Sequence, residues 1–215
     1  IEFKNVWFAY NDEDWVLKDV SFKIKAGETL ALVGATGAGK SSIINLLTRN
    51  YEINKGAIYI DGINYLDYNL NSLRKNVAVV LQDVFLFSDT IFNNITLGRE
   101  ITKEQVVTYA KEIEIEEFIE SLPQSYDYNV RERGGMLSLG QRQLISFLRA
   151  YVDKPKILVL DEATSSIDSE SEHLIQRSSE KLTKGRTSVV IAHRLATVQN
   201  ADKIILLENG EIKAV

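Results

Sequence analysis

The sequence lacks cysteine altogether, so disulfides and thiolate metal sites cannot contribute to its stability or chemistry. It also lacks long apolar runs: the best candidates, 77–81, 157–160 and 188–192, fall far short of the roughly 20 residues that cross a bilayer. No signal-peptide pattern, internal repeat or low-complexity linker is present. These absences exclude a disulfide-stapled secreted scaffold and a membrane span within the 215 residues.

An excess of positive charge is missing as well. The chain has 25 Lys and Arg against 30 Asp and Glu, a net charge of −5, and the acidic residues are scattered. Nucleic-acid surfaces are basic, so none is predicted here, and any anion site has to be built locally. With 45% apolar and 26% charged residues, the composition is that of an ordinary soluble globular protein with a large core.

Short runs of Val, Ile and Leu alternate with helical stretches along the chain. This alternation predicts an α/β fold with a mainly parallel, buried sheet. The predicted strands are Leu30 to Val33, Val77 to Leu81, Ile157 to Leu160 and Ser188 to Ala192. The N-terminal third instead alternates apolar and polar residues, at Val20, Phe22 and Ile24 and again at Ile58 and Ile60, which predicts antiparallel strands.

Two further segments complete the predicted fold. Asn209-Gly210 is a turn dipeptide between Lys203 to Leu207 and Glu211 to Val215, which indicates a hairpin at the end of the sequence. Between Thr102 and Leu122 an apolar stripe repeats at helical spacing until Pro123 ends it. The middle of the chain is therefore expected to form a helical subdomain.

A glycine-rich motif follows the first buried strand. Gly34-Ala-Thr-Gly-Ala-Gly39-Lys40-Ser41 matches G-x-x-x-x-G-K-[ST] and precedes an amphipathic run. Its glycines let successive N–H groups and the positive end of a helix dipole face phosphate oxygens, while Lys40 would reach the β and γ phosphates and Ser41 would ligate Mg²⁺. The alternative, a flexible turn beside an exposed lysine, is disfavoured by the flanking strand and helix.

Acidic residues end another buried strand, because Ile157 to Leu160 runs directly into Asp161-Glu162. Asp161 would hold Mg²⁺ through its water shell, and Glu162 would polarise the attacking water as a general base. Solvated acids in an ordinary turn are the alternative. Gln82 and His193 follow two more strands. The carboxyl ends of parallel strands share one edge, so the four strand ends that carry Lys40, Gln82, Asp161-Glu162 and His193 are expected to converge on one pocket. Taken alone, a histidine after a strand is more often a turn residue.

With these residues in place, the chain resembles the nucleotide-binding domain of ATP-binding-cassette (ABC) transporters over nearly its whole length. The segment from Leu137 to Gln143, with the sequence LSLGQRQ, resembles the LSGGQ signature of that family. The resemblance makes Gly34 to Ser41 the Walker A loop, Asp161-Glu162 the end of Walker B, Gln82 the Q-loop residue, Asp168 the D-loop residue, His193 the switch histidine and Tyr10 an aromatic that stacks on adenine. Packing on a strand face with Val6 and Phe8 is the alternative for Tyr10.

The predicted site residues fall into three groups. Those expected to bind the nucleotide are Tyr10, Gly34, Ala35, Thr36, Gly37, Ala38, Gly39, Lys40, Ser41, Ser42, Gln82, Asp161, Ser138, Gly140, Gln141 and Asp168. Those expected to hold Mg²⁺ are Ser41, Gln82 and Asp161. Those expected to take part in catalysis are Glu162 and His193.

The signature segment is a second predicted anion site. Ser138, with Gln141 three residues later, has the spacing of a capping box at a helix N-terminus; an ordinary capped helix is the alternative. In the family, each ATP lies between the Walker A loop of one domain and the signature of another in a head-to-tail dimer. Leu139 replaces a signature glycine, and its Cβ would restrict φ and crowd the phosphate. We therefore expect a heterodimer whose partner supplies an intact signature, with a homodimer as the alternative.

Two segments indicate the exporter type within the family. The first is Gln82 to Phe87, followed by Thr90-Ile91 and Asn94-Ile95. The second is Val130 to Gly134, where Arg131 replaces the usual glycine. The resemblance implies a single nucleotide-binding domain over 1–215, with a P-loop NTPase core, an N-terminal antiparallel β subdomain, and the helical subdomain and signature helix at about 83–150. It also implies ATP and Mg²⁺ as cofactors, and transmembrane domains outside this chain that tether it to the cytoplasmic face of the cell membrane and export a substrate.

Other functions fit the residues less well. A soluble ABC ATPase acting on ribosomes or nucleic acid would share the nucleotide chemistry, but such proteins usually carry tandem cassettes or a coiled-coil insertion. A small GTPase needs an N-K-x-D element, whereas Asn200-Ala201-Asp202-Lys203 has another order. A small-molecule kinase would not need the signature helix.

Overall fold

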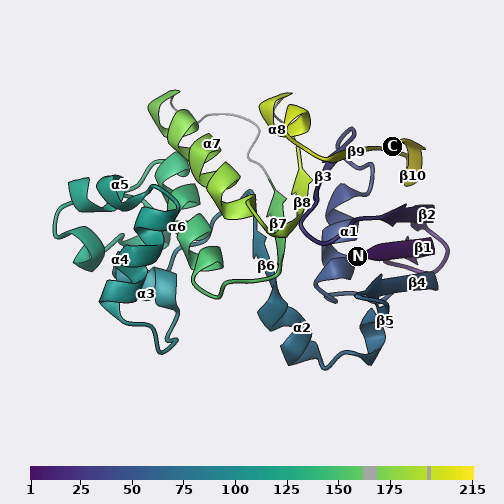
Figure 1. Cartoon of the computed structure of the whole chain (residues 1–215), viewed down its shortest axis with the longest axis horizontal. Coiled ribbons are helices and arrows are strands. Elements are labelled where there is room, and N and C mark those ends of the chain that lie inside the picture. Colours follow the sequence, from purple (N-terminus) through teal and green to yellow (C-terminus); the bar gives the residue numbers. More distant parts are fainter. Residues whose placement is uncertain (162–168, 193–194) are drawn as a thin grey trace. The chain divides into compact units, whose positions relative to one another are not determined.

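The computed structural model describes residues 1–161, 169–192 and 195–215. These residues form two compact units, which Figure 1 shows as ribbons. The sheet unit comprises the described residues of 1–79, 155–161 and 185–215, and the helical unit comprises those of 80–154 and 169–184. The prediction of one domain with a helical part at about 83–150 stays a prediction.

The larger sheet has six strands in the order β10-β9-β3-β8-β7-β6. These strands are β3 (Thr29–Val33), β6 (Val77–Val80), β7 (Ile157–Asp161), β8 (Thr187–Ile191), β9 (Lys203–Glu208) and β10 (Glu211–Ala214). β3 pairs in parallel with both β8 and β9, and β7 pairs in parallel with β8. The predicted parallel strands are confirmed, although β6 ends at Val80 and leaves Leu81 exposed.

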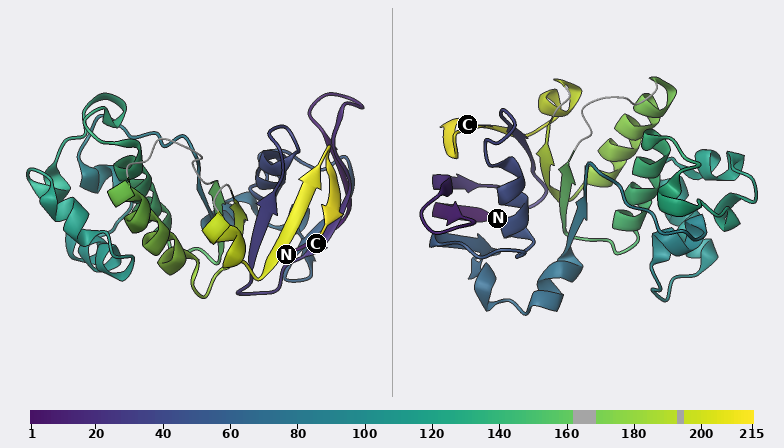
Figure 2. Two further views of the ribbon diagram at one scale, coloured as in Figure 1. Left: turned by 90° about the horizontal axis from the view of Figure 1, so that it is seen from above. Right: turned by 180° about the vertical axis from the view of Figure 1, so that it is seen from behind.

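The smaller sheet is antiparallel, with the order β2-β1-β4-β5. Its strands are β1 (Glu2–Ala9), β2 (Trp15–Lys23), β4 (Lys55–Ile60) and β5 (Ile63–Asn64). Helix α1 (Lys40–Leu47) lies between this sheet and β3 in Figures 1 and 2. Phe3 and Phe8 of β1, Leu32 of β3 and Leu46 of α1 belong to one buried cluster. The predicted alternation of the N-terminal strands is confirmed, since Val20, Phe22 and Ile58 are buried.

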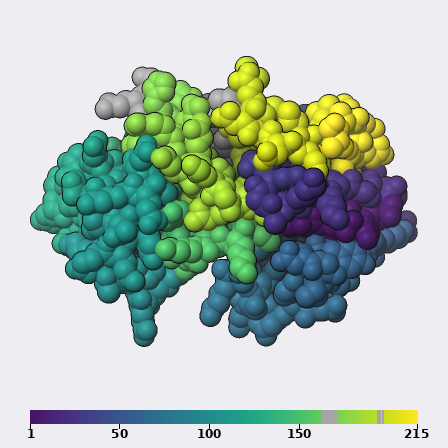
Figure 3. All heavy atoms as spheres, in the orientation of Figure 1, coloured from purple at the N-terminus to yellow at the C-terminus, as the bar shows by residue number. Residues whose placement is uncertain are grey.

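The C-terminal hairpin is confirmed in position and turn type. β9 and β10 pair in antiparallel fashion, and Asn209 and Gly210 between them have φ values of 51° and 80°, as a tight turn requires. The backbone N–H of Lys18 donates to the carbonyl of Gly210 at 2.8 Å, which ties the hairpin to β2. In Figure 3 the yellow atoms of the hairpin lie against the purple N-terminal strands.

Helices make up most of the helical unit. They are α3 (Ile91–Thr96), α4 (Lys103–Glu112), α5 (Glu116–Ser121), α6 (Leu139–Tyr151) and α7 (Ser169–Thr183), with short 3₁₀ turns at Ser125–Asp127 and Glu132–Gly134. α6 packs against both α3 and α7. The sheet unit adds α2 (Leu70–Asn76), α8 (Leu195–Gln199) and a 3₁₀ turn at Tyr65–Asp67. No helix in the described part of the chain is both long and apolar enough to cross a membrane.

The predicted helical stretch from Thr102 to Leu122 is two helices rather than one. Thr102 caps α4 through a capping box with Gln105. Glu114 then adopts a φ of 61°, a left-handed conformation that ends α4. The break leaves Ile113 and Ile115 buried, so the apolar stripe continues across it, and the periodicity alone did not reveal the turn.

Candidate functional site

The phosphate loop connects β3 to α1 in the sheet unit. Residues 35–37 at its tip are exposed, whereas Ala38 and Lys40 are buried. The turn at this tip is closed by a hydrogen bond from the N–H of Ala38 to the carbonyl of Ala35, at 3.1 Å. The strand, loop and helix predicted from the motif are therefore present, and the loop offers its tip to solvent.

At two glycines of this loop a side chain would come too close to neighbouring atoms. A Cβ on Gly34 would overlap the carbonyl of Leu207, and a Cβ on Gly39 would lie 2.7 Å from the side chain of Leu17. Gly39 also has a φ of 105°, and as the N-cap of α1 it supplies no side-chain hydrogen bond to the helix. The first turn of α1 therefore begins without a side-chain cap, the arrangement in which N–H groups remain for an anion.

Lys40 lies over the base of the loop. Its Nζ donates to the carbonyls of Gly34 at 2.7 Å and Ala35 at 2.9 Å, and the residue is 7% exposed. Burial lowers the pKa of Lys40, and the nearby carboxylate of Asp161 opposes this shift. The ammonium group is thus held inside the phosphate loop with an acid in electrostatic range.

Sheet register places Asp161 beside this loop. Asp161 at the end of β7 pairs with Ile191 of β8, which in turn pairs with Leu32 of β3, two residues before the loop starts. Asp161 is half-buried. The register confirms that β3 and β7 end at the same edge of the sheet, and the carboxylate of Asp161 acts on the pKa of Lys40 there.

Three predicted residues lie outside the described part of the chain. These are Glu162, Asp168 and His193. Their predicted roles stay predictions. Gln82 is described: it is exposed in the loop that follows β6 and belongs to the helical unit. Its predicted contact with Mg²⁺ also stays a prediction.

Tyr10 follows β1 and is 43% exposed, so it is not a core residue of the strand. Its ring stands perpendicular to that of Phe8, at a centroid distance of 4.7 Å, and to that of Tyr51, at 4.9 Å. Its hydroxyl lies 3.1 Å from the Oγ of Ser42 and accepts a hydrogen bond from the Nδ2 of Asn45 at 3.1 Å. The aromatic predicted to stack on adenine is therefore connected to α1, the helix of the phosphate loop.

The signature segment forms the start of α6 in the helical unit. Ser138 is the N-cap: its Oγ accepts from the N–H of Gln141 at 3.2 Å, and the Oε1 of Gln141 accepts from the N–H of Ser138 at 3.0 Å. The predicted capping box is confirmed. Gly140, in the first turn, is buried.

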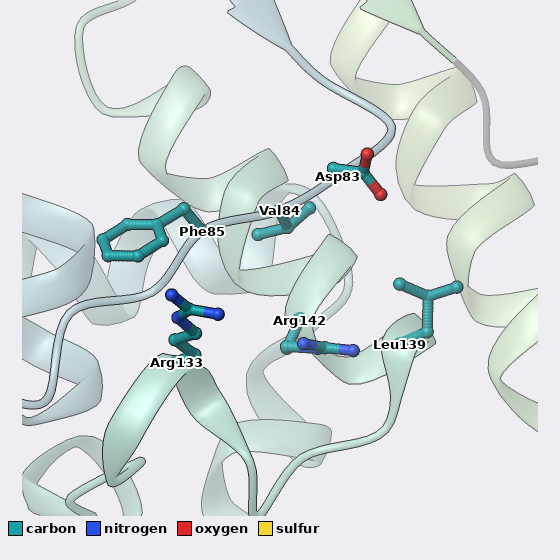
Figure 4. Close-up of a pocket in the computed structure, with 6 residues that line it drawn as sticks. All are labelled: Asp83, Val84, Phe85, Arg133, Leu139 and Arg142. Atoms are coloured by element: carbon teal, nitrogen blue, oxygen red, sulfur yellow. The ribbon is translucent and has the colours of Figure 1, made fainter.

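Leu139 opens α6 without backbone strain. It has helical geometry, so its Cβ does not force φ away from an ordinary value. Its half-buried side chain lines a cavity of about 290 Å³ within the helical unit. Figure 4 shows Leu139, Arg133 and Arg142 on one side of this cavity and the loop residues Asp83, Val84 and Phe85 on the other. The expected restriction of φ thus has no structural cost.

The segment from Val130 to Gly134, before the signature, contains two arginines with positive φ. Arg131 has φ 60° and ψ −168°, and Arg133 has a φ of 52°. An arginine at the first of these positions occupies a region that favours glycine.

Sequence reasoning missed three residues that fix the segments around these sites, namely Asn45, Tyr51 and Arg149. Asn45 interrupts the apolar run of α1, and Tyr51 follows that helix; both contact Tyr10. Arg149 donates from Nε to the carbonyl of Asn94 at 2.8 Å and from an Nη to the carbonyl of Phe85 at 3.0 Å, and the Oδ1 of Asn94 accepts from the N–H of Phe87. A polar residue inside an apolar helical run, as at Asn45 and Arg149, was the available signal.

Comparison with known proteins identifies the class that this fold and loop define. Residues 17–165 match the family model described as "ABC transporter". The chain is 50% identical over 216 residues to the ATP-dependent lipid A-core flippase of Haemophilus influenzae, covering 99% of this chain and 37% of that protein. It is also 50% identical over 213 residues to the ATP-dependent lipid A-core flippase of Legionella pneumophila, covering 99% and 36%.

A solved structure agrees with these relatives. The chain superposes with a TM-score of 0.90 and 40% identity on a bacterial Atm1-family ABC exporter with ATP bound, over 99% of this chain and 37% of that one. The chain belongs to the ABC transporter family, and it has the α/β fold of the ATPase domain of that family's exporters. It spans somewhat more than a third of the relatives' length, the 37% given above.

Proposed function

We propose that this chain binds MgATP at the phosphate loop, hydrolyses it with a water polarised by Glu162, and so powers export through transmembrane domains at the cytoplasmic face of a membrane. The observation that carries the proposal is the start of α1, where Gly39 leaves the first turn without a side-chain cap and Lys40 lies buried over the loop. A loop of this construction favours a polyphosphate.

Lys40 and the loop backbone would act together on the phosphates. Its ammonium group now donates to two loop carbonyls, and a phosphate oxygen is a stronger, charge-assisted acceptor for the same donor. The buried position reduces screening by water, so the interaction gains strength. Lys40 would therefore hold the β and γ phosphates against the N-terminus of α1.

The residues at this edge of the sheet suit Mg²⁺. Ser41 is exposed in the first turn of α1, and Asp161 is half-buried at the end of β7, within electrostatic range of Lys40. Both supply hard oxygen donors, and Mg²⁺ typically takes one or two protein ligands together with phosphates and waters. We assign Ser41, Asp161 and Gln82 to it; when bound, the ion would neutralise charge on the phosphates.

Glu162 and His193 complete the proposed reaction. Glu162 follows Asp161 directly and would take the proton of the attacking water, and His193 follows β8 and would position that water or the γ phosphate. Asp168 lies in the same connection as Glu162. These roles rest on the place of each residue in the sequence.

A second nucleotide-binding domain would complete each ATP site. Ser138, Gly140 and Gln141 would contact the ATP held by the partner, in a head-to-tail dimer, while the segment from Val130 to Gly134 would face the transmembrane domains. We propose a heterodimer, because Leu139 stands where an intact signature has glycine. Purified chain alone should then hydrolyse ATP poorly and gain activity with the right partner; full activity as a homodimer would remove the heterodimer proposal.

The substitution Glu162→Gln tests the mechanism. Its amide cannot accept the proton of water, so turnover should fall by about 100-fold or more, the usual contribution of a positioned general base. With the partner domain present, equilibrium binding of ATP should be unchanged, and a closed dimer of the two domains should accumulate in size-exclusion chromatography with ATP and Mg²⁺. The exposed substitution Glu104→Gln serves as a matched control and should retain wild-type turnover. Unchanged turnover in Glu162→Gln would overturn the assignment of the base.

A further inference from the structure

The hydroxyl end of Tyr10 is held by the helix that begins at the phosphate loop. Asn45 donates from Nδ2 to the Tyr10 Oη at 3.1 Å, and the Ser42 Oγ lies 3.1 Å from the same oxygen. Ser42 and Asn45 are three residues apart, so both occupy one side of α1 and reach the ring together. Ser42 is buried at 4% exposure, which makes this end of the contact a fixed point.

The hydrogen bonds around Asn45 form a directed chain. The Nδ2 of Asn50 donates to the Oδ1 of Asn45 at 3.5 Å, which orients the Asn45 amide with its Nδ2 toward Tyr10. Because the Tyr10 hydroxyl accepts from Asn45, its own proton is available to the Ser42 Oγ. The hydroxyl end of the Tyr10 ring is thus held by side chains of α1, those of Asn45 and Ser42.

Asn45 also fixes the second aromatic beside Tyr10. Its backbone carbonyl accepts from the N–H of Asn50 at 2.9 Å and from that of Tyr51 at 3.5 Å. The Tyr51 ring then stands at 89° to that of Tyr10. One residue of α1 therefore orients Tyr10 through its side chain and its neighbour Tyr51 through its backbone.

The backbone before Tyr10 is held by hydrogen bonds as well, so the rotamer of the Tyr10 side chain is what remains to be fixed. The N–H of Ala9 donates to the Oδ1 of Asn54 at 2.9 Å, and the N–H of Asn54 donates to the carbonyl of Trp7 at 3.0 Å. Tyr10 itself lies beyond the strand and is 43% exposed. Without a tether, such a side chain would sample several rotamers, and binding a flat ligand on its face would have to restrict them.

We propose that Asn45 is a positioning residue for base binding, which holds the Tyr10 ring in the orientation that receives the adenine and links that ring to the helix that binds the phosphates. The inference rests on the proposed function, in which Tyr10 stacks on the base. Asn45 itself touches neither the base nor the phosphates in this scheme. Its effect should therefore appear only with ligands that carry a base.

The experiment measures dissociation constants of the 215-residue chain for ATP and for inorganic tripolyphosphate, which has the phosphates without the base, by isothermal titration calorimetry. Asn45→Ala removes the side-chain donor and keeps the backbone carbonyl that holds Tyr51. We expect its Kd for ATP to rise about fivefold, the typical effect of one hydrogen bond, and its Kd for tripolyphosphate to stay unchanged. Asn45→Leu, which keeps the side-chain volume, should behave in the same way.

A double-mutant cycle with Tyr10→Phe tests the route of the effect. Tyr10→Phe keeps the ring but removes the oxygen that Asn45 contacts, so Asn45→Ala should add nothing in that background. Asn71→Ala, an exposed asparagine on α2 of the same unit, is the matched control and should bind both ligands as the wild type does.

The outcomes separate the inference from the proposed function. An equal loss of affinity for ATP and tripolyphosphate in both Asn45 variants would show a merely structural role and overturn the inference, as would full additivity with Tyr10→Phe. Wild-type affinity for ATP in Asn45→Ala would also overturn it, while the proposed function would stand. A wild-type chain that binds tripolyphosphate but gains nothing from the base would remove the base-binding role of Tyr10 and the inference with it. A wild-type chain that binds neither would overturn both proposals.

Discussion

The N-termini of α1 and α6 differ in whether a side chain pairs with their backbone N–H groups. Both helices present a positive N-terminus, but α1 begins behind Gly39, which has no side chain, whereas α6 begins behind Ser138, whose capping box occupies two backbone N–H groups. The sheet unit therefore keeps the first turn of α1 for a ligand. In the helical unit the side chain of Ser138 already accepts from one N–H of the first turn of α6, that of Gln141, so a ligand there has to share this turn with Ser138.

The phosphate loop and the segment before α6 also differ in which residues adopt a left-handed backbone. The phosphate loop uses Gly37 and Gly39 where φ is 82° and 105°. The approach to α6 instead places Arg131 and Arg133 at 60° and 52°. The first loop therefore avoids backbone strain that the second one contains. At position 39 the φ of 105° disfavours any residue other than glycine, and a Cβ there would also crowd the side chain of Leu17.

Among the substitutions at these helix starts, that of Lys40 should have the largest effect, a loss of affinity for ATP. Lys40→Ala removes the buried cation of the uncapped helix start, and loss of charge-assisted hydrogen bonds to phosphate should raise the Kd for ATP about 100-fold. Calorimetric titration with ATP measures it. Lys25→Ala, at a side chain that is 78% exposed, should leave the Kd unchanged. Equal ATP affinity in Lys40→Ala would count against the phosphate-loop interpretation.

The part of the fold that the sequence predicts well is the part with strong local signals. The strands around Leu30, Ile157 and Ser188 are buried apolar runs, and the hairpin at Asn209-Gly210 contains its own turn chemistry. The break at Glu114 was not predicted because the apolar stripe continues through it, from Ile113 to Ile115. Periodicity reports which residues are buried and cannot report a single left-handed residue between them.

The residues of the candidate site likewise fall into those that the sequence predicts and those that only the folded structure reveals. Lys40 and Asp161 were predicted from the phosphate-loop motif and from the ends of buried apolar strands, and the strand register of the structure places them at one edge. Asn45 contacts Tyr10 across 35 positions of sequence, and Arg149 contacts Asn94 across 55, so only the folded chain brings these partners together. The capping box was predictable because Ser138 and Gln141 are near neighbours.

Two substitutions of Ser138 distinguish its role in capping α6 from its proposed role in binding a phosphate. Ser138→Ala removes the cap and should lower the free energy of unfolding by about 1 kcal/mol. Ser138→Asp keeps a capping acceptor and interacts favourably with the helix dipole, so its free energy of unfolding should be close to that of the wild type. Its charge should repel a phosphate and reduce dimer-dependent ATPase activity about tenfold. The two variants are compared by urea unfolding and by ATPase assay with the partner domain. If Ser138→Asp hydrolysed ATP as fast as wild type, α6 would be an ordinary capped helix with no phosphate at its start.

Arg131 should give the smallest effect, and one of opposite sign. Its φ of 60° and ψ of −168° cost about 1 to 1.5 kcal/mol for a residue with a Cβ, and glycine would relieve this strain. Glycine also gains more entropy in the unfolded chain, which offsets roughly 0.5 to 1 kcal/mol of that relief. Arg131→Gly should therefore raise the free energy of unfolding by about 0.5 kcal/mol in urea unfolding, since strain and entropy nearly cancel. Arg131→Ala keeps the Cβ and should show no such gain, so equal stability of the Gly and Ala variants would mean that the backbone at this position relaxes freely and that the two loops do not differ in strain.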